Sequence, residues 1–251
     1  MIDIHAHFLP SIDDGPVSIE ESINMLHAYT NDGVTHVVAT PHVYLKNFSN
    51  NRSSNENAMV DFHRKIDHLS LPITLQVAGE VRFDENIPKL YRQNELPFLG
   101  TYNGLQSLLV ELPDAHIPFG ANYLIKWMID NGIQPVIAHP ERNRVIRENP
   151  SLIHDFVNIG CKLQITANSL AGGYGDQIKK AAWYMVKNSL VTAVASDAHN
   201  TLHRRPCMSL ARDLIVHECS EKEAEFLTVT GPASLCFDHA SNHEKLPTQI
   251  I

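Results

Sequence analysis

Two histidines near the start of the chain, His5 and His7, are separated by a single residue. In an extended strand, side chains two residues apart point to the same face, so both imidazoles could bind one divalent cation. The segment Asp13-Asp14-Gly15 follows, and its glycine permits a sharp turn that carries two carboxylates. The alternative is that the histidines only satisfy hydrogen bonds near a strand end, so the rest of the chain must decide.

The elements that position these residues alternate along the sequence. After the first strand, short apolar segments predict further strands at residues 35–40, 73–78, 106–110, 135–138, 162–166 and 191–195. Helical periodicity and a Ser18 cap of capping-box form predict helices at residues 18–32, 56–69, 85–93, 122–131, 151–159 and 178–187, with two or three more between 208 and 237. The polar, asparagine-rich segment at residues 47–57 is expected to be a mobile loop.

Apolar strands separated by helices indicate an α/β fold with a parallel sheet that is covered on both faces. About seven strands in 251 residues favour a distorted seven-stranded (β/α)7 TIM-like barrel with extra C-terminal helices. A doubly wound open sheet is the alternative, and both architectures place active residues at the carboxyl ends of the strands. We expect one domain over residues 1–238 and a polar C-terminal tail at residues 239–251.

Nearly every expected strand is followed by a residue that can bind a metal. A single histidine or carboxylate at such a position is more often a structural hydrogen-bonding group, but nine at the same end of successive strands predict a shared pocket. The nine residues are His5, His7, Asp14, His42, Glu80, Glu111, His139, Asp197 and His199. Mixed imidazole and carboxylate ligands suit Mn, Fe or Zn better than Ca or Mg, and nine ligands imply two or three ions, with Glu80 bridging.

Five segments together resemble the motifs of the PHP (polymerase and histidinol phosphatase) superfamily. They are His5-Ala6-His7 through Asp14-Gly15, Thr40-Pro41-His42, Gly79-Glu80, His139-Pro140-Glu141-Arg142 and Ser196-Asp197-Ala198-His199-Asn200. Within that superfamily the chain is most similar to the bacterial manganese-dependent protein-tyrosine phosphatases that serve capsule and exopolysaccharide synthesis. The resemblance covers residues 2 to about 206 in the right order, and implies the PHP fold.

The resemblance also implies roles for individual residues. It places His5, His7, Glu80 and Asp197 around a first metal, Glu80, Glu111 and His139 around a second, and Asp14, His42 and His199 around a third. His42 is counted among the catalytic residues as well. Arg142 is expected to bind substrate phosphate together with Arg204, for which Arg205 is an alternative. Each arginine could instead form only a surface ion pair.

The expected reaction is metal-assisted hydrolysis of a phosphomonoester, in which bound cations lower the pKa of water and Arg142 neutralises phosphoryl charge. Because no cysteine nucleophile is required, activity should be lost to chelators and resist thiol alkylation. The resemblance implies a phosphotyrosine protein as substrate, namely the tail of a bacterial tyrosine autokinase. The alternatives are a small-molecule phosphatase of the histidinol-phosphate type and a non-catalytic scaffold with the PHP fold.

Composition limits the partners and the cellular location that we expect for the protein. A formal net charge of -8 argues against nucleic acid as a main partner. The four cysteines are widely spaced, which is typical of free thiols in a reducing compartment. No apolar segment approaches membrane-spanning length, and the early first strand leaves no room for a signal peptide, so we expect a cytoplasmic protein without membrane insertion. The sequence leaves open whether the chain forms an oligomer.

Overall fold

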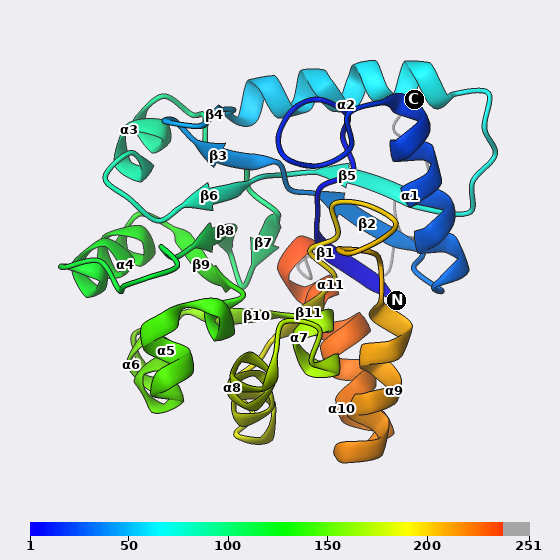
Figure 1. Cartoon of the computed structure of the whole chain (residues 1–251). Coiled ribbons are helices and arrows are strands. Elements are labelled where there is room, and N and C mark those ends of the chain that lie inside the picture. The colour runs from blue at the N-terminus through cyan, green and yellow to red at the C-terminus, as the bar shows by residue number, and fades with distance from the viewer. Residues whose placement is uncertain (238–251) are drawn as a thin grey trace.

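Parallel strands form the centre of the structure, a computed structural model that describes residues 1–237 (Figure 1). One sheet has the order β1 (Ile2–Ala6), β2 (His36–Ala39) and β5 (Thr74–Val77). The second has the order β11 (Ala193–Ala195), β10 (Lys162–Thr166), β9 (Ile133–Ala138), β8 (Leu105–Glu111), β6 (Glu80–Arg82), β3 (His42–Tyr44) and β4 (Phe48–Ser49), with β7 (Gly100–Tyr102) paired to β8. The pairs β3–β4 and β7–β8 are antiparallel, and the other pairs are parallel.

The two sheets are connected at two places, by continuity of the chain and by backbone hydrogen bonds. Chain direction continues from β2 into β3 across Pro41 and from β5 into β6 across Gly79, and the Glu80 amide donates to the Pro41 carbonyl at 3.1 Å. Beyond β1, the His7 amide donates to the Ala198 carbonyl at 2.9 Å, just after β11. The carboxyl ends of the parallel strands therefore meet on one side of the molecule.

Most helices lie around the outside of these strands, whereas α11 lies near the centre of the view beside β1 and β11 (Figure 1). They are α1 (Ile19–Asn31), α2 (Arg52–Ile66), α3 (Ile87–Arg92), α4 (Ala121–Asp130), α5 (Arg144–Glu148), α6 (Ile153–Ile159), α7 (Ala167–Ala171), α8 (Asp176–Lys187), α9 (Met208–Glu218), α10 (Glu221–Glu225) and α11 (Gly231–Cys236). Short 3-10 segments occupy Pro140–Arg142 and Pro150–Leu152, and a π-helical turn occupies Phe226–Thr230. Within residues 1–237, no helix combines the length and the apolar character needed to cross a membrane.

β1 and β9 are buried along their whole length, as expected for strands of a parallel sheet that is covered on both faces. In β9, Val136 and Ala138 join the smaller hydrophobic cluster, whereas Ile133 and Ile137 join the larger one. Leu235 of α11 belongs to the smaller cluster, and this helix contacts β1, β7 and β11. The alternation fixes the register of each strand, because a shift of one residue would exchange the two faces.

The fold is mixed α/β, as the sequence predicts, but it differs in detail. Residues 1–237 contain eleven strands rather than seven, because pairing resumes after Pro41 and Gly79 as β3 and β6, and because the short strands β4 and β7 add antiparallel pairs. The expected tail at residues 239–251 lies outside the described residues.

Two local predictions were wrong. The segment 47–57 was expected to be a loop, but it contains β4 and the start of α2, where Asn51 accepts a hydrogen bond from the Ser54 amide at 2.9 Å and acts as the N-cap. At the start of α1, Ser18 caps the helix, but the Glu21 carboxylate accepts from the Val17 amide instead of the Ser18 amide that a capping box requires.

Candidate metal centre and phosphate pocket

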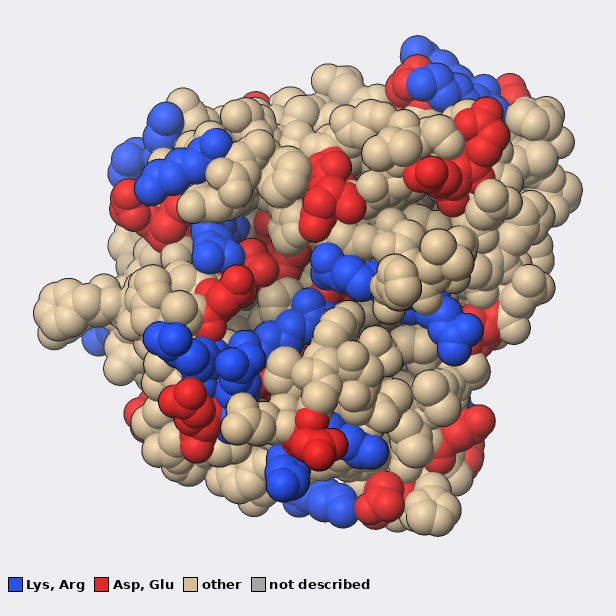
Figure 2. Space-filling view, viewed as in Figure 1, with Lys and Arg blue, Asp and Glu red and all other residues tan. Residues whose placement is uncertain are grey.

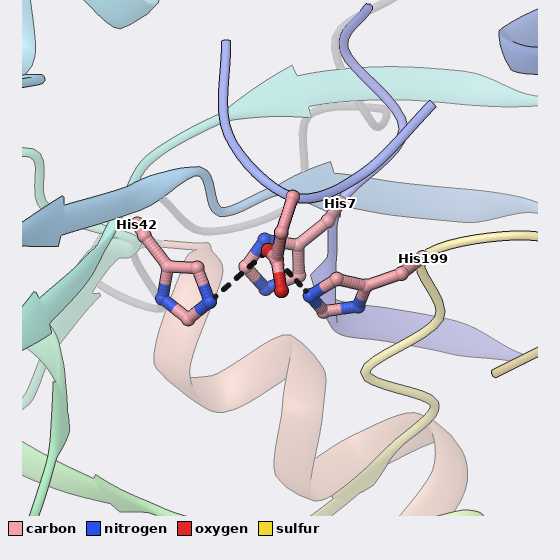
Figure 3. Close-up of side chains that lie close together, drawn as sticks. His7, His42 and His199 are labelled. Carbon is pink, nitrogen blue, oxygen red and sulfur yellow. Dashed lines mark ion pairs between the residues drawn. The ribbon is translucent and has the colours of Figure 1, made fainter. Parts of the chain in front are cut away.

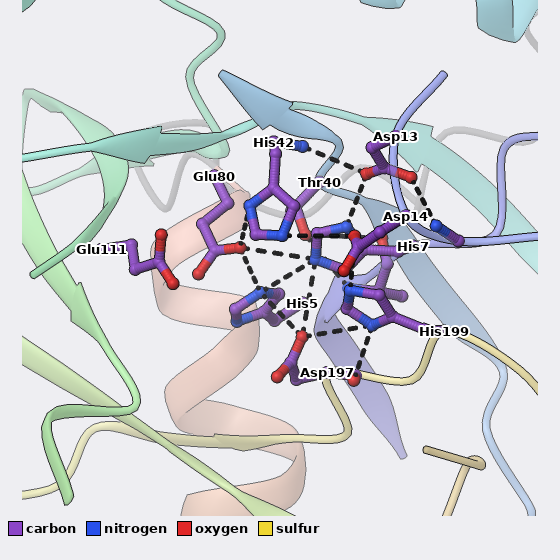
Figure 4. Close-up of polar contacts among 12 residues, drawn as sticks. His5, His7, Asp13, Asp14, Thr40, His42, Glu80, Glu111, Asp197 and His199 are labelled. Atoms are coloured by element: carbon purple, nitrogen blue, oxygen red, sulfur yellow. Dashed lines mark hydrogen bonds and ion pairs between the residues drawn. The ribbon is translucent and has the colours of Figure 1, made fainter. Parts of the chain in front are cut away.

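All nine residues singled out as metal ligands lie together at the carboxyl ends of the strands. Figure 4 labels all of them except His139. β1 and the loop after it provide three of them, β3, β6 and β8 provide one each, and the segments after β9 and β11 provide the rest. The residues are His5, His7 and Asp14; His42, Glu80 and Glu111; and His139, Asp197 and His199. The structure therefore brings these nine side chains close together, and their role as metal ligands stays a prediction.

The deepest part of the cluster is fully buried. Nε2 of His5 lies 3.2 Å from Oε2 of Glu80 and 3.3 Å from Oδ1 of Asp197. Nε2 of His7 approaches the same two oxygens, at 3.4 and 3.5 Å. Two imidazole nitrogens and two carboxylate oxygens thus face one small space.

A second group of side chains surrounds the other oxygen of Glu80. Nε2 of His139 lies 2.7 Å from Oε1 of Glu80 and 3.9 Å from Oε1 of Glu111. Glu111 also accepts a hydrogen bond from Nη1 of Arg82 at 2.8 Å, which orients its carboxylate. Glu80 lies between the two groups, the position that a bridging carboxylate would need.

The third group is closer to solvent (Figure 3). Oδ1 of Asp14 lies 3.1 Å from Nε2 of His199 and 3.4 Å from Nε2 of His42. The ring of His7 stacks on that of His199 with 3.8 Å between centroids, so His7 contributes to this group as well as to the deepest one.

Among the buried side-chain polar atoms that have no hydrogen-bond partner within residues 1–237, three belong to the nine clustered residues. They are Oε2 of Glu80, Oδ1 of Asp197 and Nε2 of His199. Nε2 of His199 is close to Asp14, but the approach lacks hydrogen-bond geometry. Since burying an unsatisfied polar atom is costly, their convergence fits a site that holds cations. The donor set of imidazole nitrogen and carboxylate oxygen suits Mn, Fe or Zn.

The charges of the cluster shift its pKa values strongly. Burial lowers the pKa of His5, but the carboxylates of Glu80 and Asp197 outweigh burial and raise it to about 9. Burial likewise opposes ionisation of His42, and the Glu80 carboxylate raises its pKa to about 11. Burial would raise the pKa of Glu80, yet His5 and His42 hold it well below its usual range. In the metal-free cluster His5 and His42 are thus cationic beside an anionic Glu80, whereas burial lowers the pKa of His199 to about 4.

Two residues that sequence reasoning did not assign a role orient the histidines. Oε1 of Gln164, in β10, lies 2.8 Å from Nδ1 of His5, and Oδ2 of Asp13 lies 2.6 Å from Nδ1 of His7. Such partners fix the ring tautomer and direct Nε2 toward a metal. The signals available in the sequence were a polar Gln164 within an otherwise apolar strand and Asp13, the first aspartate of the Asp13-Asp14 pair.

A tight turn at Gly15 holds Asp13 in place. The Gly15 amide donates to Oδ1 of Asp13 at 3.0 Å, and a Cβ at position 15 would lie 2.5 Å from the carbonyl oxygen of His7. Glycine is therefore required by this close approach. The His42 amide also donates to Asp13 Oδ2, at 3.1 Å, which connects the turn to β3.

Two arginines lie beside the cluster. Nη2 of Arg142 is 2.5 Å from Oδ2 of Asp197, and Nη2 of Arg204 is 2.8 Å from the same oxygen. Both arginines line a pocket of about 620 Å³, together with Asp14, His42, Glu111 and His139. Arg205, the alternative left open by the sequence, is exposed and does not line this pocket.

Backbone strain marks the same place. His139 has φ of 31° and Asp197 has φ of 51°, in the left-handed region that residues other than glycine rarely adopt. Such conformations persist where the surrounding structure enforces them, and they concentrate at functional sites. Here they turn two site residues inward at strand ends.

An imidazole–carboxylate cluster next to two arginines, at the carboxyl ends of parallel strands, defines a metal-dependent enzyme of phosphoryl chemistry. The chain belongs to the CpsB/CapC family of capsular polysaccharide synthesis, whose family model matches residues 1–236.

Its relatives agree with this class. Tyrosine-protein phosphatase YwqE of Bacillus subtilis is 37% identical over 204 residues, which cover 81% of this chain and 79% of YwqE. Tyrosine-protein phosphatase CpsB of Streptococcus pneumoniae is 28% identical, over 95% of this chain and 99% of CpsB. A chain from the crystal structures of these two metal-dependent tyrosine phosphatases matches with a TM-score of 0.86 and 34% identity, over 94% of both chains. The resemblance inferred from sequence is confirmed, and the histidinol-phosphate alternative gains no support.

Proposed function

We propose that this chain is a metal-dependent protein-tyrosine phosphatase that acts on the tail of a bacterial tyrosine autokinase and so regulates capsular or exopolysaccharide synthesis. The observation that carries the proposal is the placement of Arg142 and Arg204 in one pocket with His42, His139 and Asp14. Family membership and relatives named as tyrosine-protein phosphatases support the same activity.

For the metal we propose two to three divalent ions, with manganese as the resident metal and iron or zinc as alternatives. The three ligand sets would be those implied by the resemblance: His5, His7, Glu80 and Asp197; Glu80, Glu111 and His139; and Asp14, His42 and His199. When bound, the ions would supply Lewis acidity and make hydroxide available from water near neutral pH. The unpaired buried oxygens of Glu80 and Asp197 support this assignment.

The side chains themselves would bind and orient the substrate. Arg142 and Arg204 would offer planar N–H groups to two phosphoryl oxygens, where bidentate contact is both strong and directional. Nη2 of Arg142 also donates to Oγ1 of Thr166 at 2.7 Å, so the guanidinium is held before substrate arrives. A phenolate leaving group has a pKa near 10, so it needs less protonation than the alkoxide from serine phosphate.

The decisive experiment is metal reconstitution of chelator-treated protein with three substrates: a phosphotyrosine peptide, a phosphoserine peptide and histidinol phosphate. We expect manganese-dependent release of phosphate from the phosphotyrosine peptide alone. His139→Ala should abolish activity, whereas His68→Ala, a change at an exposed histidine after α2, should not. Turnover of histidinol phosphate alone would indicate a small-molecule phosphatase instead. No turnover with any metal would favour a non-catalytic scaffold.

We further propose a single catalytic domain over residues 1–238, built as a distorted seven-stranded barrel. In this interpretation β2 with β3, and β5 with β6, each count as one interrupted strand, and the antiparallel β4 and β7 lie outside the barrel. The hydrogen bonds between residues 5–7 and 197–198 would complete the circuit. A cytoplasmic location would place the enzyme with the kinase tail. A single cooperative unfolding transition is expected for the whole chain, and two separate transitions would contradict one domain.

A further inference from the structure

The pocket beside the metal cluster extends past the two phosphate-binding candidates onto helix α5. Arg144 and Arg147 of this helix line it, as do Tyr174 and Ile178 from the region of α8. Figure 2 shows Lys and Arg side chains gathered along one side of the central hollow and Asp and Glu along the facing side. A volume of about 620 Å³ is in the range that accommodates a ligand larger than a single phosphorylated side chain.

Arg144 and Arg147 have no carboxylate within 4 Å among residues 1–237, unlike Arg142 and Arg204, which both pair with Asp197. Nε of Arg147 is buried and has no hydrogen-bond partner there. Asp114 also lines the pocket, but it contacts Arg144 through its backbone carbonyl oxygen and not through its carboxylate. Two cations thus face the pocket with their charge unmatched, in a chain whose net charge is -8.

The local fold keeps these arginines on the pocket side. Residues three apart on a helix share a face, so Arg144 and Arg147 point the same way. Asn143 caps α5 by accepting from the Ile146 amide at 3.1 Å, and it donates to the carbonyls of Pro113 at 2.7 Å and His116 at 3.0 Å. The helix is therefore fixed to the loop that forms the rim of the pocket.

We propose that Arg144 and Arg147 form a second anion subsite that binds an acidic group of the substrate near its phosphotyrosine and so sets sequence preference. The proposal rests on the proposed function, since it needs a phosphotyrosine in the neighbouring part of the pocket. Arginine is suited to carboxylate or phosphate by its planar fork. The Arg142 guanidinium lies over the Tyr174 ring at 4.6 Å from its centroid, so this tyrosine lines the same pocket directly beside the phosphate-binding candidate.

The experiment compares kcat/KM of the manganese-loaded enzyme for three otherwise identical phosphotyrosine peptides. One has neutral residues beside the phosphotyrosine, one has glutamates there, and one has a second phosphotyrosine. We expect wild type to prefer both anionic peptides about tenfold, and Arg144→Gln with Arg147→Gln to bring the ratio to about one. Arg147→Lys should retain part of the preference, and Arg64→Gln, at an exposed arginine of α2, should retain all of it.

A binding measurement separates recognition from turnover. Anisotropy with fluorescent peptides that carry a non-hydrolysable phosphonate should show the same preference, and 0.5 M salt should weaken it, because exposed charges are screened. A preference for the doubly phosphorylated peptide alone would identify phosphate as the second group. Equal kcat/KM for all three peptides in wild type would overturn the subsite while leaving the proposed function standing. Failure to cleave any of the peptides would instead reject the proposed function.

Discussion

Arg204 donates a hydrogen bond from Nη2 to Oδ2 of Asp197 at 2.8 Å, which connects an arginine of the loop after β11 to the buried imidazole–carboxylate cluster. The loop reaches this position because the Asn200 carboxamide oxygen accepts from the amides of residues 202, 203 and 204. The Arg204 carbonyl in turn accepts from the amides of His199 and Asn200. This compact turn directs Arg204 into the pocket and leaves Arg205 exposed.

The two neighbouring arginines therefore make a matched pair for mutagenesis. Arg204→Gln should lower kcat/KM for an aryl phosphate roughly 100-fold or more, because it removes a charged donor from developing phosphoryl charge. Arg205→Gln should change it less than about twofold, as is usual for an exposed side chain away from the site. Steady-state kinetics on metal-loaded protein decide the matter, and a larger loss for Arg205 would show that the assignment is reversed.

Asp13 is expected to act through His7. Asp13→Asn weakens the acceptor that holds Nδ1 of His7 at 2.6 Å, so Nε2 of this ring is less basic and less well oriented. We expect manganese affinity to fall about 10- to 100-fold, measured by titration calorimetry. Asp61→Asn, which alters only an exposed ion pair with Lys65 on α2, is the control and should bind manganese like wild type. Unchanged affinity in Asp13→Asn would mean that the hydrogen bond is incidental.

The sequence predicted the nine clustered residues because each follows a strand, and in a parallel sheet those ends lie on one side. It could not predict Gln164 or Asp13 in the same way. Their contribution is a hydrogen bond to the outer nitrogen of a ring, and it depends on which strands become neighbours. β10 reaches His5 only through the folded arrangement, 159 residues away in sequence. The pattern of residue types identifies candidate ligands of a site more readily than the residues that orient those ligands.

The sequence missed the short strands β3 and β6 for a related reason. Apolar segments locate the buried parts of strands, but β3 and β6 begin at His42 and Glu80, whose side chains belong to the polar site. The apolar segments end where the polar site residues begin, although strand pairing continues past Pro41 and Gly79. The same limitation applies to Asn51, where an asparagine-rich sequence is equally compatible with a loop and with a helix cap.

Metal binding should release protons. In the metal-free protein, burial lowers the pKa of His5, but Glu80 and Asp197 outweigh it and raise the pKa to about 9. His5 is then protonated at pH 7 and must lose its proton to bind a cation, so affinity should increase as pH rises from 6 to 9. Calorimetry in two buffers of different ionisation enthalpy should give at least one proton released per protein at pH 7. A proton count of zero at that pH would contradict the prediction.

The thiols should be irrelevant to catalysis, and their environments provide the test. Burial raises the pKa of Cys161, Cys207 and Cys236 to about 12, whereas Cys219 is exposed. At pH 8 a thiol with that pKa is ionised in only about one molecule in 10⁴, and the thiolate is the form that reacts.

Iodoacetamide should therefore modify Cys219 alone in the native protein, with full retention of phosphatase activity, and all four cysteines after denaturation. Peptide mass spectrometry beside an activity assay gives both readouts, and Cys219→Ser should remove the native adduct. A chelator added to a second portion of each sample should abolish turnover. Loss of activity in proportion to modification of a buried thiol would instead indicate a cysteine nucleophile and contradict the metal-dependent mechanism.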